Sequence, residues 1–180
     1  LVLNFFDYFY KKKISNFLKK NQLGNIDIFL DVGAHKGESI NFFLKELNIK
    51  NIYSFEASQI NFDELKKRLP RLIKKFNETN IYIENIALGA IEKKVILKQF
   101  NESSSSTISD INENSSYFKK KHKYINKKKK NTFYHNIDTT VIPLSQYLIY
   151  KKIENIDFLK IDTEGYELNI LKGLKNKIRN

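Results

Sequence analysis

Apolar residues occur along the chain in short continuous runs and, between these runs, at helical spacing. This pattern predicts short buried strands separated by helices. Between the strands, apolar positions fall three and four residues apart, as at 40–47 and 62–69, the period of a helix packed on one face. Strands that alternate with helices predict an α/β fold with parallel strands. Buried strands are predicted at residues 26–32, 51–55, 81–86 and 156–161.

Local signals add detail to this pattern. Ser58 precedes the second helical stretch and can cap it, whereas Pro70 is expected to interrupt that helix or restart it. The last helix carries Leu168, Leu171 and Leu174. A further strand is predicted at residues 95–97, extended chain at 137–144 and a short helix at 145–150.

The first 24 residues form a segment of their own, in which residues 1–18 show the spacing of an amphipathic helix. Lysines 11–13 follow the apolar positions instead of preceding them, so the segment does not resemble a signal peptide. We expect the helix to pack on the edge of the domain. Peripheral contact with a membrane surface is the alternative.

Composition excludes several classes of site. The 180 residues contain no cysteine, so disulfides, thiolate metal ligands and cysteine nucleophiles are excluded. The three histidines are scattered, and we expect no metal site. Because no apolar run approaches the roughly 18 residues of a membrane span, we expect a cytoplasmic protein without a transmembrane segment.

The net charge of +12 comes largely from one segment. Eight of the 32 basic residues lie between residues 119 and 130, without which the net charge falls to +4. Only three bases are arginine, and lysine, asparagine and isoleucine are abundant, as an AT-rich coding sequence would impose. Residues 102–136 are therefore interpreted as a Ser/Lys-rich surface insertion, in which the serines can form a lid or a plain loop. A surface for an anionic partner is the alternative.

Acids and glycines follow three of the predicted strands, where ligands of open parallel sheets bind. Gly33 and Gly37 flank a tight strand-to-helix turn after Asp31, and Glu56 ends the second strand, where an acid can accept hydrogen bonds from a ribose diol. The turn is neither G-x-G-x-x-G nor a P-loop, which argues against a dehydrogenase or a nucleotide-phosphate site.

These segments resemble the FkbM-type family of S-adenosylmethionine-dependent methyltransferases. The resemblance extends over about residues 25–174 and implies a class I methyltransferase fold, a Rossmann-like three-layer sandwich with a mostly parallel sheet, within a domain of residues 25–180. The matching segments are DVGAHKGES (31–39), SFEAS with NFDEL (54–58 and 61–65), ENIALG (84–89), SSSST (103–107) and IDFLKIDTEGYELNILKG (156–173).

The resemblance also implies roles for individual residues. The cofactor would be S-adenosylmethionine, and the reaction would be methyl transfer to a hydroxyl of a small molecule, sugar or glycan, as in polysaccharide biosynthesis. Asp162 and Glu164 would face the methyl group and the acceptor, with Asp162 also orienting the cofactor. The other cofactor-binding residues would be Asp31, Gly33, Ala34, His35 and Gly37 in the turn, Glu56 and Ala57 at the ribose, and Asn85 and Ala87 near the adenine.

Alternatives remain at this stage. Either Asp162 or Glu164 is the candidate general base, but Asp162 can instead only orient the cofactor while Glu164 stabilises a turn. Only 15 residues follow Gly165, so the closing strands of a class I sheet are expected to be missing, and a truncated, non-catalytic remnant is an alternative. A nucleic-acid methyltransferase is the other, although the D/N/S-P-P-Y/F segment of amino-methylating enzymes is absent.

Overall fold

The computed structural model describes residues 2–100, 106–109 and 134–174. The chain divides into two compact units, and each is described by itself. The first unit comprises Leu1–Asn85 and Leu148–Ile161, and the second comprises Ile86–Tyr147 and Asp162–Asn180. The proposed division at residue 24 stays a prediction, and most of the proposed insertion at 102–136, including the lysine segment, lies outside the described residues.

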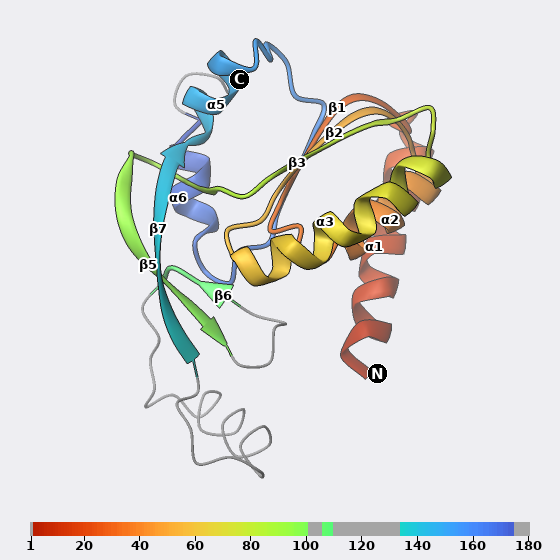
Figure 1. Ribbon diagram of the computed structural model, residues 1–180. Coiled ribbons are helices and arrows are strands. Elements are labelled where there is room, and N and C mark those ends of the chain that lie inside the picture. Colours follow the sequence, from red (N-terminus) through yellow and green to blue (C-terminus); the bar gives the residue numbers. More distant parts are fainter. Residues whose placement is uncertain (1, 101–105, 110–133, 175–180) are drawn as a thin grey trace. The chain divides into compact units, whose positions relative to one another are not determined.

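A four-stranded parallel sheet forms the centre of the first unit (Figure 1). The described strands follow the order β3-β2-β1-β8, so β1 is paired on both sides. All four predicted strands of this sheet are confirmed, and with them the α/β class and the parallel pairing. Their bounds are Asn25–Val32 for β1, Asn48–Phe55 for β2, Asn80–Glu84 for β3 and Phe158–Ile161 for β8.

The start of β1 is tied to the start of β8 by a side chain. The Asp157 carboxylate accepts hydrogen bonds from the backbone N–H groups of Asp27 and Ile28, at 2.9 and 2.8 Å. The Asp157 N–H donates in turn to the carbonyl of Ile28 at 3.1 Å. These bonds fix the register in which β8 joins the sheet.

Three helices are grouped beside strands β1 to β3: α1 (Val2–Lys20), α2 (Glu38–Glu46) and α3 (Gln59–Lys75) (Figure 1). Apolar residues of α2 and α3 pack with alternate residues of β1 and β2 to form the core. Ser58 caps α3 as predicted, since its side chain accepts a hydrogen bond from the Asn61 N–H. The fully buried residues of the core include Phe29, Ile40, Ile52 and Leu65.

The prediction that Pro70 interrupts or restarts α3 is wrong. The helix runs through Pro70 to Lys75, and beyond the proline Leu72 is buried in the same core as Leu65. A proline in a helix removes one N–H donor and crowds the preceding turn, which costs about 3 kcal/mol. Burial of the apolar face on both sides of Pro70 offsets that cost.

The second unit contains a mixed sheet with the order β4-β7-β5-β6 (Figure 1). Strand β4 pairs with β7 in parallel, whereas β5 pairs with β7 and β6 in antiparallel fashion, which the sequence pattern does not reveal. A last helix, α6 (Glu167–Lys172), also belongs to this unit, and α5 (Leu144–Tyr150) links it to the first. The strands are β4 (Ala87–Gly89), β5 (Lys93–Phe100), β6 (Ser106–Thr107) and β7 (Tyr134–Pro143).

Candidate active site

The turn between β1 and α2 uses all its backbone N–H groups within the protein. Residues 33–37 therefore present no spare amide to an anionic ligand, in contrast to turns that cradle phosphates. The N–H groups of Gly33 and Ala34 donate to the Phe55 carbonyl, and that of Gly37 donates to the Ala34 carbonyl. Those of His35 and Lys36 donate to the side-chain carboxylates of Glu56 and Glu38, and all five distances are 2.8–3.1 Å.

Glu56 joins the turn after β1 to the turn after β2. Its Oε2 accepts the N–H of His35 at 2.8 Å, and its Oε1 accepts the N–H of Ser58 at 2.9 Å. Burial raises the pKa of Glu56, although both backbone bonds favour the ionised form. A carboxylate offers about four acceptor positions, so two remain after the backbone bonds are made.

Beneath the turn, Asp31 and Lys160 form a buried ion pair that links β1 to β8. The Lys160 Nζ lies 3.0 Å from the Asp31 Oδ1, with exposed side-chain fractions of 15% and 0%. The same Nζ donates to the Gly33 carbonyl at 2.9 Å, and the Ser39 hydroxyl donates to the Asp31 Oδ2 at 2.6 Å. Asp31 thus holds the first turn of α2, and Lys160 holds the backbone of the glycine turn.

Gly37 lacks a side chain for reasons of packing as well as conformation. Its φ of +88° belongs to the left-handed region, and a Cβ there would lie 2.8 Å from the Leu65 Cδ1. His35 also has a positive φ, of 50°, which costs a non-glycine residue about 1–3 kcal/mol. Its backbone bond to Glu56 and its ring contact with Glu38, at 3.2 Å, hold it there.

Glu38 is the first residue of α2, and its carboxylate contacts Arg68, the His35 ring and the backbone of the turn. Its Oε1 lies 3.0 Å from the Arg68 guanidinium, and its Oε2 accepts from the His35 ring and the Lys36 N–H. Burial favours the neutral form, but the hydrogen bonds from the His35 ring, the backbone and Arg68 outweigh it and bring the pKa of Glu38 to about 2.

Replacing Glu38 by glutamine is expected to lower the free energy of unfolding by about 0.5–1 kcal/mol near neutral pH, since the side chain is half exposed and solvent screens the pair. A carboxyl whose pKa falls on folding stabilises the protein above its unfolded pKa, near 4.5. The difference between wild type and variant should therefore be complete above pH 4.5 and shrink as pH falls toward 2. Urea unfolding across this range measures it. Glu64→Gln, which breaks an exposed pair with Lys67, is the control with a smaller effect.

Asn85 connects the end of β3 to the segment that follows β2. Its Nδ2 donates to the Glu56 carbonyl at 2.8 Å, so the side chain braces the backbone around Glu56. Ala57 lies in the same segment and its carbonyl is 3.5 Å from that Nδ2. All the predicted site residues from Asp31 to Asn85 thus belong to the first unit. Ala87 is buried in β4 and belongs to the second.

Asp162 and Glu164 lie in an exposed loop of the second unit, between β8 and α6. Glu164 has a φ of 54°, and its carbonyl accepts a hydrogen bond from the Thr107 hydroxyl at 2.8 Å. Glu167 Oε1 accepts the N–H groups of Thr163 and Gly165, at 3.0 and 3.1 Å. Burial opposes its charge, but these backbone bonds lower the pKa of Glu167.

The family model described as "Methyltransferase FkbM domain" matches residues 31–180 of this chain. That range includes both the turn with Glu56 and the loop with Glu164. The chain belongs to the FkbM methyltransferase family. No match is found among curated proteins.

A crystal structure of the methyltransferase FkbM from Methylobacillus flagellatus KT has a similar fold. It matches with a TM-score of 0.52 and 19% sequence identity, over 86% of this chain and 30% of that chain. The FkbM domain of this protein therefore has the Rossmann-like α/β fold that the sequence resemblance implies. It spans about a third of the length of the solved protein.

Several residues that hold the FkbM segments in place were absent from the predicted site. Lys160 and Glu167 are the first and last residues of the K-I-D-x-E-G-x-E motif (160–167), so the motif is the sequence signal that could have identified them. Thr107 ends the SSSST segment, whose first three serines lie outside the described residues. The Ser109 hydroxyl donates a hydrogen bond to the Gly165 carbonyl at 2.8 Å, and no sequence pattern marks this residue.

Among the residues that the structure describes, no group of three or more histidine, aspartate or glutamate side chains has an arrangement that could hold a metal ion. Within the same residues, no helix is both long and apolar enough to cross a membrane.

Proposed function

We propose that this FkbM domain binds S-adenosylmethionine at the carboxyl ends of β1 and β2 and transfers a methyl group to a hydroxyl of a small molecule or glycan. The observation that carries the proposal is the turn at residues 33–37, whose N–H groups are all used internally beside a buried carboxylate. Such a site suits a nucleoside with a ribose diol and no phosphate, which distinguishes S-adenosylmethionine from dinucleotides.

Glu56 fits this cofactor because its carboxyl oxygens retain acceptor positions after both backbone bonds are made. Ribose hydroxyls would occupy them, while Asn85 fixes the backbone of the same residue. Lys160 would keep the Gly33 carbonyl, and with it the turn, in one position. When bound, S-adenosylmethionine supplies a methyl group on a sulfonium, a strong electrophile.

Asp162 and Glu164 are the proposed proton acceptors for the hydroxyl. Both are exposed carboxylates, so each is able to meet an acceptor from solvent. The backbone of the loop that carries them forms hydrogen bonds with the side chains of Glu167, Thr107 and Ser109. Holding a base in place in this way reduces the entropy lost on reaching the reactive geometry.

Glu56→Gln is expected to weaken S-adenosylmethionine binding by about 10- to 100-fold, because an amide nitrogen cannot accept the hydrogen bonds that the carboxyl oxygen accepts, and a lost bond at a buried group costs about 1–3 kcal/mol. Isothermal titration calorimetry of both proteins measures the change. Glu84→Gln makes the same substitution at the end of neighbouring β3, where the carboxylate pairs with Lys151, and should leave the affinity unchanged.

Two results would contradict the proposal. Unchanged affinity in a folded Glu56→Gln variant would leave Glu56 as a brace between turns and nothing more. No heat of binding with the wild-type chain, at cofactor concentrations that saturate other methyltransferases, would favour the non-catalytic remnant. Thermal unfolding with and without S-adenosylmethionine distinguishes lost binding from lost folding, because a ligand raises the stability of a folded variant that binds it.

A further inference from the structure

The side of helix α1 that packs on the first unit is mixed, with polar residues beside Leu18 and Tyr8. Ser15 is fully buried, and Lys12 and Lys19 on the same side form ion pairs with Glu46 of α2 at 2.7 and 2.9 Å. An ordinary surface helix would place its apolar residues on this side. The packing of α1 buries part of Leu18 and leaves other apolar residues of the helix to solvent.

The outer side carries an apolar stripe of three residues, Tyr10, Ile14 and Phe17. Their spacing of four and three places them on one face of the helix, opposite Ser15. Their exposed fractions are 65%, 44% and 63%. Two aromatic rings and an isoleucine thus lie largely in water along about two turns of the helix.

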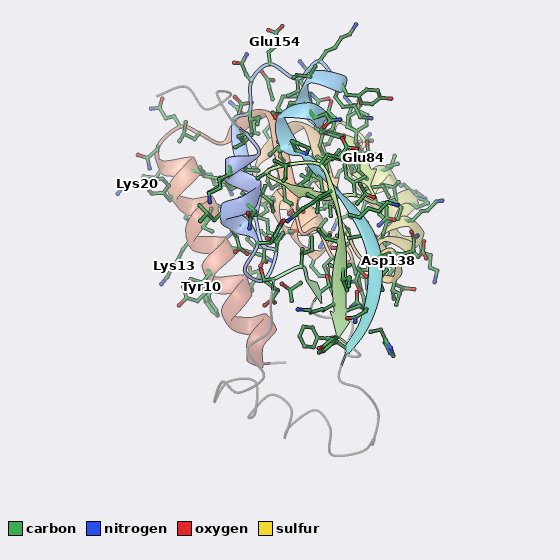
Figure 2. The ribbon with its side chains drawn as sticks, turned by 90° about the vertical axis from the view of Figure 1, so that its left-hand side faces the viewer. Tyr10, Lys13, Lys20, Glu84, Asp138 and Glu154 are labelled. Carbon is green, nitrogen blue, oxygen red and sulfur yellow. The ribbon has the colours of Figure 1, made fainter. Side chains whose placement is uncertain are left out.

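Lysines flank this stripe. Lys13 and Lys20 are exposed and seven residues apart, so they follow one edge of the stripe, and the Lys13 Nζ lies 5.7 Å from the centre of the Tyr10 ring. Figure 2 shows Tyr10, Lys13 and Lys20 projecting outward from α1. The helix contains five lysines and one acid, and two of the lysines, Lys12 and Lys19, share the single carboxylate of Glu46.

We propose that α1 binds an anionic membrane surface, with the stripe of Tyr10, Ile14 and Phe17 at the boundary between headgroups and acyl chains and with Lys13 and Lys20 against anionic headgroups. Aromatic and aliphatic residues beside lysines on one helix are the pattern of helices that lie in the membrane plane. Each lysine near such a surface adds attraction that salt weakens. This surface is independent of the proposed methyl transfer.

Charge favours a membrane over a second copy of the chain as the occupant. Two copies of α1 meeting through this face would bring the lysines of both helices together, which is unfavourable. An anionic bilayer neutralises them and buries the stripe at the same time. Tyrosine suits the boundary, since its ring is apolar and its hydroxyl remains hydrated.

The chain contains no tryptophan, so Phe17→Trp introduces a single fluorophore into the stripe. We expect its emission to shift to shorter wavelength on vesicles of phosphatidylcholine with phosphatidylserine, and the shift to diminish with salt. Ile73→Trp, at a residue of α3 that is 47% exposed, is the matched control and should show no shift. A shift equal in both variants, or absent from both, would overturn the proposal.

Vesicle sedimentation of the 180-residue chain tests the two parts of the surface separately. Replacing Tyr10, Ile14 and Phe17 together by serine should reduce the bound fraction at least about tenfold, and Lys13→Gln with Lys20→Gln by about tenfold or more. The controls are Ile60→Ser with Ile73→Ser, and Lys66→Gln with Lys74→Gln, all on exposed positions of α3. Equal vesicle binding by the stripe and control variants would overturn the proposal. So would a wild-type chain that binds no vesicles but forms dimers on gel filtration that the stripe variant does not form.

Discussion

Replacing Lys160 by methionine is expected to lower the free energy of unfolding by about 3–5 kcal/mol, because it leaves the Asp31 carboxylate charged and uncompensated in the interior. Asp31 is fully buried and, among the residues that the structure describes, would keep the Ser39 hydroxyl as its hydrogen-bond partner. The Gly33 carbonyl would also lose its bond from the lysine. Urea unfolding followed by circular dichroism measures the change.

Two further variants make the result specific to the buried charge. Asp31→Asn combined with Lys160→Met should recover most of the lost stability, because the double variant buries no net charge. Lys151→Met breaks the Lys151–Glu84 pair, which is partly exposed, and should cost about 1 kcal/mol or less. A cost for Lys160→Met no larger than that of Lys151→Met would show that the buried pair does not stabilise the sheet.

Gly173→Ala is expected to destabilise the second unit by about 3 kcal/mol or more, through a collision between backbones. A Cβ on Gly173 would overlap the carbonyl oxygen of Gly89, at the place where the end of α6 meets β4. A backbone oxygen has no rotamer by which to move away. The two glycines that end the ENIALG and LKG segments thus touch each other.

Gly24→Ala is the matched control for this substitution. Its new Cβ would approach no atom closer than 3.8 Å, and no stability change beyond about 0.5 kcal/mol is expected. Thermal unfolding of both variants, with circular dichroism as the signal, provides the comparison. Equal melting temperatures for Gly173→Ala and wild type would mean that α6 shifts away from β4 at little cost.

The sequence predicts the strands of the parallel sheet and the residues that lie at their carboxyl ends. Short apolar runs identify β1, β2, β3 and β8, and parallel pairing then aligns the ends that carry Asp31 and Glu56. The spacing of glycines and acids around these ends also excludes a phosphate turn, which the occupied N–H groups explain in structural terms. These features are local, so a single segment carries each of them.

Long-range features escape prediction for the opposite reason. The interaction of Lys160 with Asp31 depends on β8 joining β1, and Glu167 acts by accepting backbone N–H groups of a loop whose conformation no local pattern reveals. The antiparallel pairing of β5 and β7 depends on chain beyond a long connection. The prediction that Pro70 breaks α3 fails because burial of apolar residues on both sides of the proline outweighs its low helix propensity.

The register of β8 against β1 has a consequence for folding. Asp157 binds a strand residue, Ile28, that lies 129 positions earlier in the chain, so this sheet has high contact order and is expected to form slowly. Until Phe158–Ile161 is available, one side of β1 remains an unpaired edge that contains Phe29 and Leu30. A chain cut before Phe158 is therefore expected to aggregate through this edge.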